Sequence, residues 1–298
     1  MTVLCPAGVL DRGARRGKIL QHFATSDGAR IAYEEAGSGR PLVLLHGLMA
    51  HSGFFAQQRE LAADFRLIAV DLRGHGRSRV DGTPPTVERV AEDIVELVQA
   101  LDLENAVGIG WSLGASVLWH VLRGPAAARF SGAVIVDMTP RVLNEGDWNL
   151  GLSAEVCEAR RTAIRDDFPA FAAAAGQAMF AQPVADDKKE LAGWAGDEFA
   201  RNDAPAIAAL WASLMRDDLR GALAGIGQPT LVIHGAHSQL YGSGTADHIV
   251  TALPNARAVR FDRSGHAPHM EQPELFNRLV RDFAASLPRV REPQATAQ

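Results

Sequence analysis

A serine between two glycines is the residue with the clearest potential for chemistry. Ser112 lies in Gly110-Trp111-Ser112-Leu113-Gly114, directly after an apolar run and before a helical pattern. A serine on a sharp strand-to-helix turn projects its hydroxyl above the sheet, and the residues two positions away on either side must be small. Gly110 and Gly114 meet that demand, so the pattern predicts Ser112 as a nucleophile.

His266 is the predicted base for this serine. A serine hydroxyl is a weak nucleophile near neutral pH and needs an imidazole within hydrogen-bond distance to accept its proton. His266 lies in a loop after the last apolar run, close to the start of a helical pattern. His269 is an alternative that would otherwise line the entrance or cap that helix. His75 is a weaker alternative, and His46 is expected to be a structural ring bonded to the backbone.

Two backbone amides are predicted to bind the negative charge of a tetrahedral intermediate. Such charge needs N–H groups that already point at it. Leu113 follows the serine, and Leu48 follows the His46-Gly47 bend, where glycine lets the chain turn an amide inward. Met49 and Trp111 are adjacent to these two residues, and we predict that both contact the substrate.

Short apolar strands alternate with amphipathic helices, and they must position these residues. The expected strands are 40–46, 66–71, 106–110, 132–137, 229–235 and 256–262, and the clearest helices are 86–101, the run after Ser112, and 273–287. Strands that are apolar throughout are buried on both faces by crossover helices. The order predicts an α/β fold with a mostly parallel, doubly wound sheet. A hairpin with its turn near Asp27 and Gly28 adds an antiparallel edge.

The alternation stops after Asp137 and resumes near residue 228. From 138 to 227 no strand is evident, while Ala, Trp, Met and Leu recur at helical spacing. We therefore predict a flexible tail at 1–20, a core formed by 21–137 and 228–290, and an inserted helical cap, or lid, at 138–227. Within the cap, Trp148 and Trp211 are predicted to bind a small or medium apolar acyl or alcohol group.

Four motifs together resemble those of the α/β-hydrolase family. They are the His46-Gly47 bend, a D-x-x-G-H-G-x-S loop at 71–78, the turn around Ser112, and the segment GHAPHMEQPE at 265–274, and they occur in the family's order. The resemblance implies an eight-stranded sheet with a cap inserted after the sixth strand. It also implies a triad of serine, acid and histidine at the carboxyl ends of the strands.

The acid of this triad departs from the commonest family pattern. The family usually carries it just after the seventh strand, but no Asp or Glu occurs from 219 to 246, and Ser238 occupies that place. A minority of the family places the acid at the end of the sixth strand. Asp137 ends that strand here, so we assign it the role of orienting His266. Glu145, Asp147 and Asp247 are weaker alternatives.

The expected reaction is hydrolysis of a carboxylic ester of a small molecule through an acyl-enzyme. Ser112 would attack the carbonyl and His266 would transfer the proton, with no cofactor and no metal. The resemblance leaves a lactonase, thioesterase, perhydrolase or carbon–carbon bond hydrolase as alternatives. A catalytically silent ligand-binding protein is a further alternative. A carboxylate nucleophile, as in dehalogenases, is disfavoured because Ser112 stands at that position.

Composition excludes several other classes. The net charge of -5 and the pI near 6.1 provide no basic surface for nucleic acid. Cys5 and Cys157 cannot build a disulfide framework or a thiolate metal cluster. No apolar run approaches the roughly 18 residues that span a membrane, and the basic residues near the start follow the apolar ones, unlike those of a signal peptide. We predict a cytoplasmic protein; the oligomeric state is not indicated.

Overall fold

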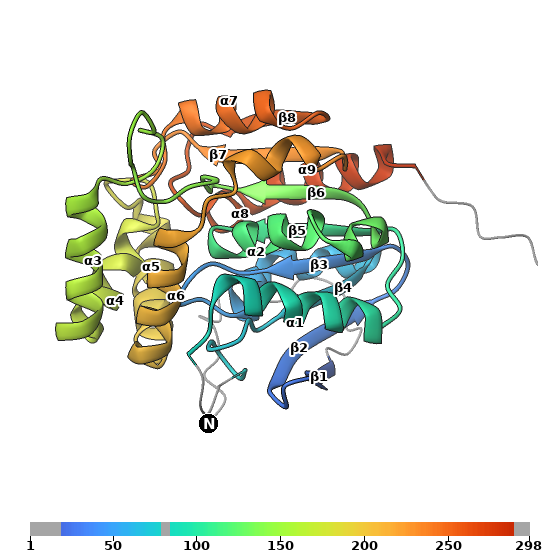
Figure 1. The fold of residues 1–298 in the computed structure, drawn as a ribbon, viewed down its shortest axis with the longest axis horizontal. Coiled ribbons are helices and arrows are strands. Elements are labelled where there is room, and N and C mark those ends of the chain that lie inside the picture. The colour runs from blue at the N-terminus through green and yellow to red at the C-terminus, as the bar shows by residue number, and fades with distance from the viewer. Residues whose placement is uncertain (1–18, 79–83, 289–298) are drawn as a thin grey trace, which may run out of the picture.

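The computed structural model describes residues 19–78 and 84–288, and its strands form one eight-stranded sheet (Figure 1). The strands are β1 (Ile19–Ala24), β2 (Arg30–Gly37), β3 (Pro41–Leu45), β4 (Arg66–Val70), β5 (Ala106–Trp111), β6 (Phe130–Val136), β7 (Thr230–Gly235) and β8 (Ala256–Phe261). Their order in the sheet is β1-β2-β4-β3-β5-β6-β7-β8. Among the described strands, β2 alone runs opposite to the other seven, since it pairs antiparallel with both β1 and β4. The predicted mostly parallel sheet with an antiparallel hairpin at its edge is confirmed.

Helices cover both faces of the sheet, as the apolar strands require. Every residue of β3 and of β5 is buried. The helix α2 (Leu113–Leu122) packs on β3 and β5 and against α1 (Val87–Ala100). A second group packs on β2 and β4 and consists of a 3-10 helix at Ser52–Ala63 with α8 (Pro268–Glu271) and α9 (Pro273–Ser286). The central strands are thus shielded from water on both sides.

The site lies where the strand order reverses. β3 pairs in parallel with β4 on one side and with β5 on the other. The chain therefore adds β4 on one side of β3, and then crosses over to add β5 and the later strands on the other side. In open α/β sheets, such a reversal opens a crevice at the carboxyl ends of the two strands. His46 follows β3 and Ser112 follows β5, so both begin the loops that border this crevice.

Four α-helices and two short 3-10 helices, Asp186–Lys188 and Arg220–Gly225, lie between β6 and β7. The α-helices form most of this segment. They are α3 (Ala154–Asp166), α4 (Phe168–Ala178), α5 (Lys189–Phe199) and α6 (Ala204–Arg216). Figure 1 shows them beyond the end of the sheet to which the β6 arrow points. This stretch holds one isolated β-bridge, Leu143 to Leu152, and no strand, in agreement with the predicted helical content. The function of this insertion as a cap or lid stays a prediction.

Two boundaries differ from the prediction or lie outside the described residues. β1 begins at Ile19, so the last two residues of the predicted tail belong to the sheet. The rest of that tail, with Cys5, lies outside the described residues, as does the end of the chain from 289. The helix α7 (Ser243–Ala252) contains Asp247. Within 19–78 and 84–288, the helices are all too short or too polar for a transmembrane span.

Glu271 joins the helical insertion to the loop of His266. Its carboxylate accepts hydrogen bonds from the backbone N–H of Ala181, which follows α4, and of Gly265, each at 2.7 Å. Burial raises the pKa of the Glu271 carboxyl to about 7, although these two N–H groups favour the charged form. Burial therefore disfavours the charged form of the Glu271 carboxyl, although this group connects the two segments.

The raised pKa of the Glu271 carboxyl should make the stability of the fold depend on pH. Between its unfolded pKa near 4.5 and its folded pKa of about 7, the folded chain keeps a proton that the unfolded chain has released. Stability from this group therefore falls as the pH rises through that window and is constant above it. We expect the melting temperature of the wild type, relative to Glu271→Gln, to decrease between pH 5 and pH 8. The exposed Glu274 provides the control Glu274→Gln, and a difference that does not change with pH would contradict the shift.

Candidate active site

Ser112 lies at a backbone turn that its neighbours are built to permit. It separates β5 from α2 with φ 52° and ψ -120°. A Cβ atom on Gly110 would lie 2.5 Å from the Gly114 carbonyl oxygen, and one on Gly114 would collide with the Leu45 carbonyl. Both glycines are thus required by close approach of backbone to backbone, as predicted from their spacing. The turn leaves Ser112 half-buried at the edge of a cavity.

Asp137 and His266 are hydrogen-bonded to one another. His266 Nδ1 lies 2.8 Å from Asp137 Oδ1, and both side chains are buried. The same carboxylate accepts the Ser238 hydroxyl at Oδ1 (2.8 Å) and the Gly235 N–H at Oδ2 (2.9 Å). Ser238, which occupies the place where the family usually carries its acid, thus donates to Asp137, the predicted acid. In the described part of the chain, no other carboxylate lies within hydrogen-bond distance of His266.

The weaker acid alternatives lie elsewhere. Glu145 is exposed and pairs with Arg141. Asp247 lies within α7, where its carbonyl accepts the hydroxyl of Thr251. The hydrogen bonds of the described residues join neither of them, nor Asp147, to His266.

The backbone of His266 is fixed from two directions. Its carbonyl accepts the indole N–H of Trp111 at 2.7 Å, which ties it to the strand that leads to Ser112. Its own N–H donates to the Met179 carbonyl at 2.8 Å, which ties it to the end of α4. The imidazole is therefore oriented by Asp137 and placed by backbone contacts with both the sheet and the insertion.

Backbone strain is concentrated at the predicted site. Five described residues other than glycine have a positive φ, and three of them are Met49 (68°), Ser112 (52°) and Asp137 (45°). Side chains in this region are sterically disfavoured and persist where the surrounding structure enforces them. The loops after β3, β5 and β6 each hold one such residue, which indicates that the fold imposes their positions.

Leu113 follows Ser112 directly, and Leu48 lies in the bend that approaches Ser112. Leu113 is the first residue of α2, so its N–H has no carbonyl partner within the helix. Gly47 packs so closely that a Cβ on it would lie 3.2 Å from Ser112 Cβ, which brings the bend before Leu48 beside the serine. His46 stabilises this bend, since its Nε2 accepts the Leu72 N–H at 2.9 Å and its Nδ1 contacts the Gly47 carbonyl at 2.7 Å.

The other histidines of the motifs are buried and structural. Burial lowers the pKa of His75 to about 4, and its Nδ1 lies 3.2 Å from the Arg73 carbonyl. Burial likewise lowers the pKa of His269 to about 3, and its ring packs against Trp111 and Phe55. Among the described residues no side chain caps α9, and His269 is fully buried and does not line the cavity, so it neither lines the entrance nor caps that helix.

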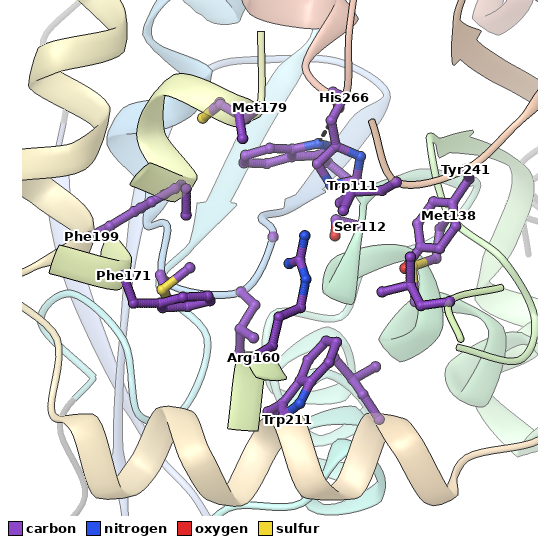
Figure 2. Close-up of a pocket in the computed structure, with 18 residues that line it drawn as sticks. Trp111, Ser112, Met138, Arg160, Phe171, Met179, Phe199, Trp211, Tyr241 and His266 are labelled. Atoms are coloured by element: carbon purple, nitrogen blue, oxygen red, sulfur yellow. Dashed lines mark hydrogen bonds between the residues drawn. The ribbon is translucent and has the colours of Figure 1, made fainter. Parts of the chain in front are cut away.

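Several of the predicted site residues line one cavity, which has a volume of about 740 Å³ when the open space at its mouth is included. Ser112 and His266 line it together with Leu48, Met49, Trp111 and Trp211. Figure 2 shows Ser112 and His266 on the side of the cavity opposite the indole of Trp211. Most of the remaining wall is apolar, with Met138, Phe171 and Phe199 among its residues. Such a cavity suits a small organic ligand with few polar groups.

Trp148 is the predicted substrate contact that the structure places elsewhere. It is not among the residues that line the cavity. Its indole N–H donates to the Arg141 carbonyl at 3.0 Å, and its ring packs against His248 and under Arg220. Trp148 lies in the loop before α3 and not on a helix, so helical spacing could not indicate where it packs, and the expectation that it lines the cavity was wrong.

Arg160 is the charged residue of the cavity that sequence reasoning missed. It comes from α3 and lines the cavity among apolar side chains. In the sequence it belongs to the charged run EARRTAIRD, which is typical of a solvated helix face. No sequence signal separates Arg160 from its neighbour Arg161, whose side chain is exposed.

One cluster of side chains has the residue types of a metal site, but the nitrogen atoms of its histidine are already hydrogen-bonded within the protein. Single ligand atoms of Glu88, His120 and Asp217 lie within 4.8 Å of one another. His120 Nε2 is already bonded to Asp217 at 2.9 Å, and its Nδ1 is bonded to Arg123 at 2.9 Å. Both ring nitrogens are thus occupied, so the cluster is a hydrogen-bonded network of the protein.

The chain is similar to known enzymes in sequence and in fold. Its residues 42–279 match the Alpha/beta hydrolase family. The pimeloyl-[acyl-carrier protein] methyl ester esterase of Nitrosomonas europaea is 32% identical over 253 residues, or 83% of this chain and 97% of that protein. The esterase of the same name from Nitrosospira multiformis is 33% identical over 263 residues, or 84% of this chain and 97% of that protein.

Solved structures show the same relationship. An esterase from Exiguobacterium antarcticum superposes with a TM-score of 0.85 at 25% identity, over 90% of this chain and 100% of that chain. The family match spans most of the chain and includes both the turn at Ser112 and the loop of His266. The protein is therefore a member of the α/β-hydrolase family.

Proposed function

We propose that this chain, a carboxylic ester hydrolase, cleaves its ester with Ser112, His266 and Asp137 as a catalytic triad. The observation that carries the proposal is the 2.8 Å bond between His266 Nδ1 and Asp137 Oδ1, with His266 and Ser112 lining one cavity. The named esterases among its relatives support the hydrolysis of an ester. The geometry supports the division of roles among the three residues.

The first half of the reaction forms an acyl-enzyme. His266 Nε2 accepts the hydroxyl proton of Ser112 as the Ser112 oxygen bonds to the ester carbonyl carbon. The carbonyl oxygen becomes an anion, which the N–H groups of Leu48 and Leu113 stabilise. When the intermediate collapses, the bond to the leaving oxygen breaks, and His266 returns its proton to the departing alcohol.

Water completes the cycle at the same residues. His266 accepts a proton from a water molecule, whose oxygen attacks the acyl carbon. The second tetrahedral anion uses the same two amides, and its collapse releases the carboxylic acid and restores the Ser112 hydroxyl. No other reactant is needed for atoms and charges to balance.

Asp137 selects the working form of the imidazole. Its Oδ1 accepts from His266 Nδ1, so the proton of the neutral ring is held on that nitrogen and Nε2 is free to act as a base. Hydrogen bonds from Ser238 and from the Gly235 N–H hold the carboxylate in its position. The imidazolium that forms during attack is then stabilised by a buried negative charge.

The insertion between β6 and β7 acts in this proposal as a cap. It supplies apolar cavity residues such as Phe171, Phe199 and Trp211, which exclude water from the acyl group. Its substrate is then a small ester that fits beneath these helices, and the cytoplasm is kept as its predicted location. Lactones and thioesters present the same carbonyl to Ser112, and no specific observation favours them here.

Replacing the nucleophile tests the proposal directly. With a chain-length series of p-nitrophenyl esters, we expect the wild type to show a length optimum. Ser112→Ala should lose turnover by about 10⁴-fold or more, because the attacking oxygen is absent. Ser243→Ala, at the exposed start of α7, is the matched control and should hydrolyse esters like the wild type.

An organophosphonate separates an enzyme from a silent binding protein. We expect it to label the wild type and Ser243→Ala but not Ser112→Ala, as detected by mass spectrometry of the intact chain. A wild type that neither hydrolyses any ester nor becomes labelled would overturn the proposal.

Replacing the acid tests the assignment of Asp137. We expect Asp137→Asn to lower kcat by roughly 10⁴-fold, as measured with the best p-nitrophenyl ester, because the amide no longer holds the working tautomer. Asp102 has the same φ of 45° but is exposed and pairs with Arg129, so Asp102→Asn is a matched control with unchanged turnover. Near-normal activity of Asp137→Asn would move the acid to another residue.

A second substitution distinguishes a lost acid from a disturbed fold. Ser238 Oγ lies 2.8 Å from Asp137 Oδ1, so an aspartate at 238 would bring a carboxylate next to His266. In the Asp137→Asn background, we expect Ser238→Asp to restore part of the lost turnover.

A further inference from the structure

Arg160 brings a positive charge into an otherwise apolar cavity. It lies in the second turn of α3, and Figure 2 shows its side chain extending from the insertion toward Ser112. The cavity residues around it include Phe171, Trp211 and Leu214. Among the residues that line this cavity in the described chain, Arg160 alone carries a permanent charge.

The guanidinium has no anionic partner among the described residues. The ion pairs of the described chain do not include Arg160, whereas Arg161 pairs with Glu158 at 2.7 Å on the exposed side of the same helix. The titratable groups that face Arg160 are the Tyr241 hydroxyl and the Cys157 thiol. Burial raises the pKa of both groups, so both are neutral at neutral pH.

The surroundings make this charge unfavourable in the free protein. Burial lowers the pKa of the Arg160 guanidinium, which shows that its charged form loses hydration. Its one cation–π contact within the described part of the chain is the ring of Trp211, with 5.8 Å from the guanidinium carbon to the ring centroid. A ring face attracts a cation but does not neutralise it. The cavity therefore contains a cationic group that a bound anion would satisfy.

We propose that Arg160 binds a carboxylate on the substrate, so that the preferred substrates are half-esters of dicarboxylic acids. This inference rests on the proposed ester hydrolysis and specifies its substrate class. The ester carbonyl is placed at Ser112, the carbon chain lies along the apolar wall, and the free carboxylate accepts hydrogen bonds from the guanidinium. A guanidinium presents two parallel N–H groups that match the two oxygens of a carboxylate.

The charge of the cavity favours a carboxylate over a phosphate. A carboxylate carries one negative charge, which the single guanidinium of Arg160 neutralises. A phosphate monoester carries nearly two near neutral pH and would bring uncompensated charge against Met138, Phe171 and Trp211. The expected apolar acyl group is thus refined to an apolar chain with a charged end.

Matched ester pairs test the inference. The monomethyl and dimethyl esters of linear dicarboxylic acids of increasing length differ only in whether one end is charged. For each length, the ratio of kcat/KM for the half-ester to that for the diester measures recognition of the carboxylate. We expect Arg160→Gln to lower this ratio by about 10- to 100-fold at the optimal length, the range for hydrogen bonds between charged groups.

Two further variants control for charge and for folding. Arg161→Gln removes an arginine from the same helix at an exposed position and should keep the wild-type ratio. Arg160→Lys keeps a charge without the planar pair of donors and should give an intermediate ratio. Melting temperatures show whether each variant is folded. An unchanged ratio in folded Arg160→Gln would overturn the inference and leave Arg160 with a structural contact to Trp211.

A binding measurement separates this inference from the proposed hydrolysis. In the Ser112→Ala background, where the nucleophile is absent, calorimetry with the best half-ester measures affinity without turnover. We expect Arg160→Gln to raise Kd by about 10- to 100-fold. Equal affinities would overturn the carboxylate site even if esters are hydrolysed. A monoalkyl phosphate that binds more tightly than the half-ester would also overturn it, in favour of a phosphate. Loss of affinity without turnover of any ester would support the site and contradict the proposed function.

Discussion

The carboxylate of Asp137 connects the ends of three neighbouring strands, and much of the site depends on it. It ends β6, accepts the N–H of Gly235 at the end of β7, and binds the imidazole of His266 in the loop after β8. A buried carboxylate is stable only if its oxygens accept enough hydrogen bonds to replace water. The Ser238 hydroxyl supplies the third bond. The carboxyl ends of these strands are thereby joined around one negative charge.

The helical insertion is part of the same arrangement. The Met179 carbonyl accepts the N–H of His266, Glu271 accepts the N–H of Ala181, and the amide of Asn202 donates to the Met49 carbonyl at 2.6 Å. These bonds join the insertion to the loops after β8 and β3. A displacement of the segment after α4 would therefore change the position of His266 as well as the shape of the cavity. The insertion thus lines part of the cavity and also helps to place the predicted base.

Membership of a family defines the shared scaffold, whereas the choice of substrate depends on side chains that differ within it. In this chain the proposed nucleophile, the proposed base and the two proposed oxyanion amides lie on the sheet and in the loops that follow its strands, where close contacts enforce the backbone. Arg160 and most of the apolar wall lie on the insertion. The chemistry and the proposed specificity are thus supplied by two parts of the structure that meet at one cavity.

The sequence by itself determined the features that local patterns encode. Continuous apolar runs indicated β3 to β8 within one or two residues, and the glycines around Ser112 indicated a turn that only small residues permit. The position of Asp137 followed from the lack of any carboxylate after the seventh strand, together with a minority pattern of the family. Each of these inferences depends on neighbours in the chain or on the order of motifs.

The tertiary structure alone decided which side chains of the insertion reach the cavity. By residue type, Trp148 would be expected to line the apolar cavity and Arg160 to face water. The structure shows the reverse, since the tryptophan packs outside the cavity and the arginine lines it. The orientation of α3 decides the outcome for Arg160. Trp148 lies in the loop before α3, where its contacts with Arg141, His248 and Arg220 decide its place. These outcomes arise from contacts between residues far apart in the chain, which spacing along one helix does not encode. For the same reason the burial of His269 and the link from Glu271 to Ala181 became evident only in the folded chain.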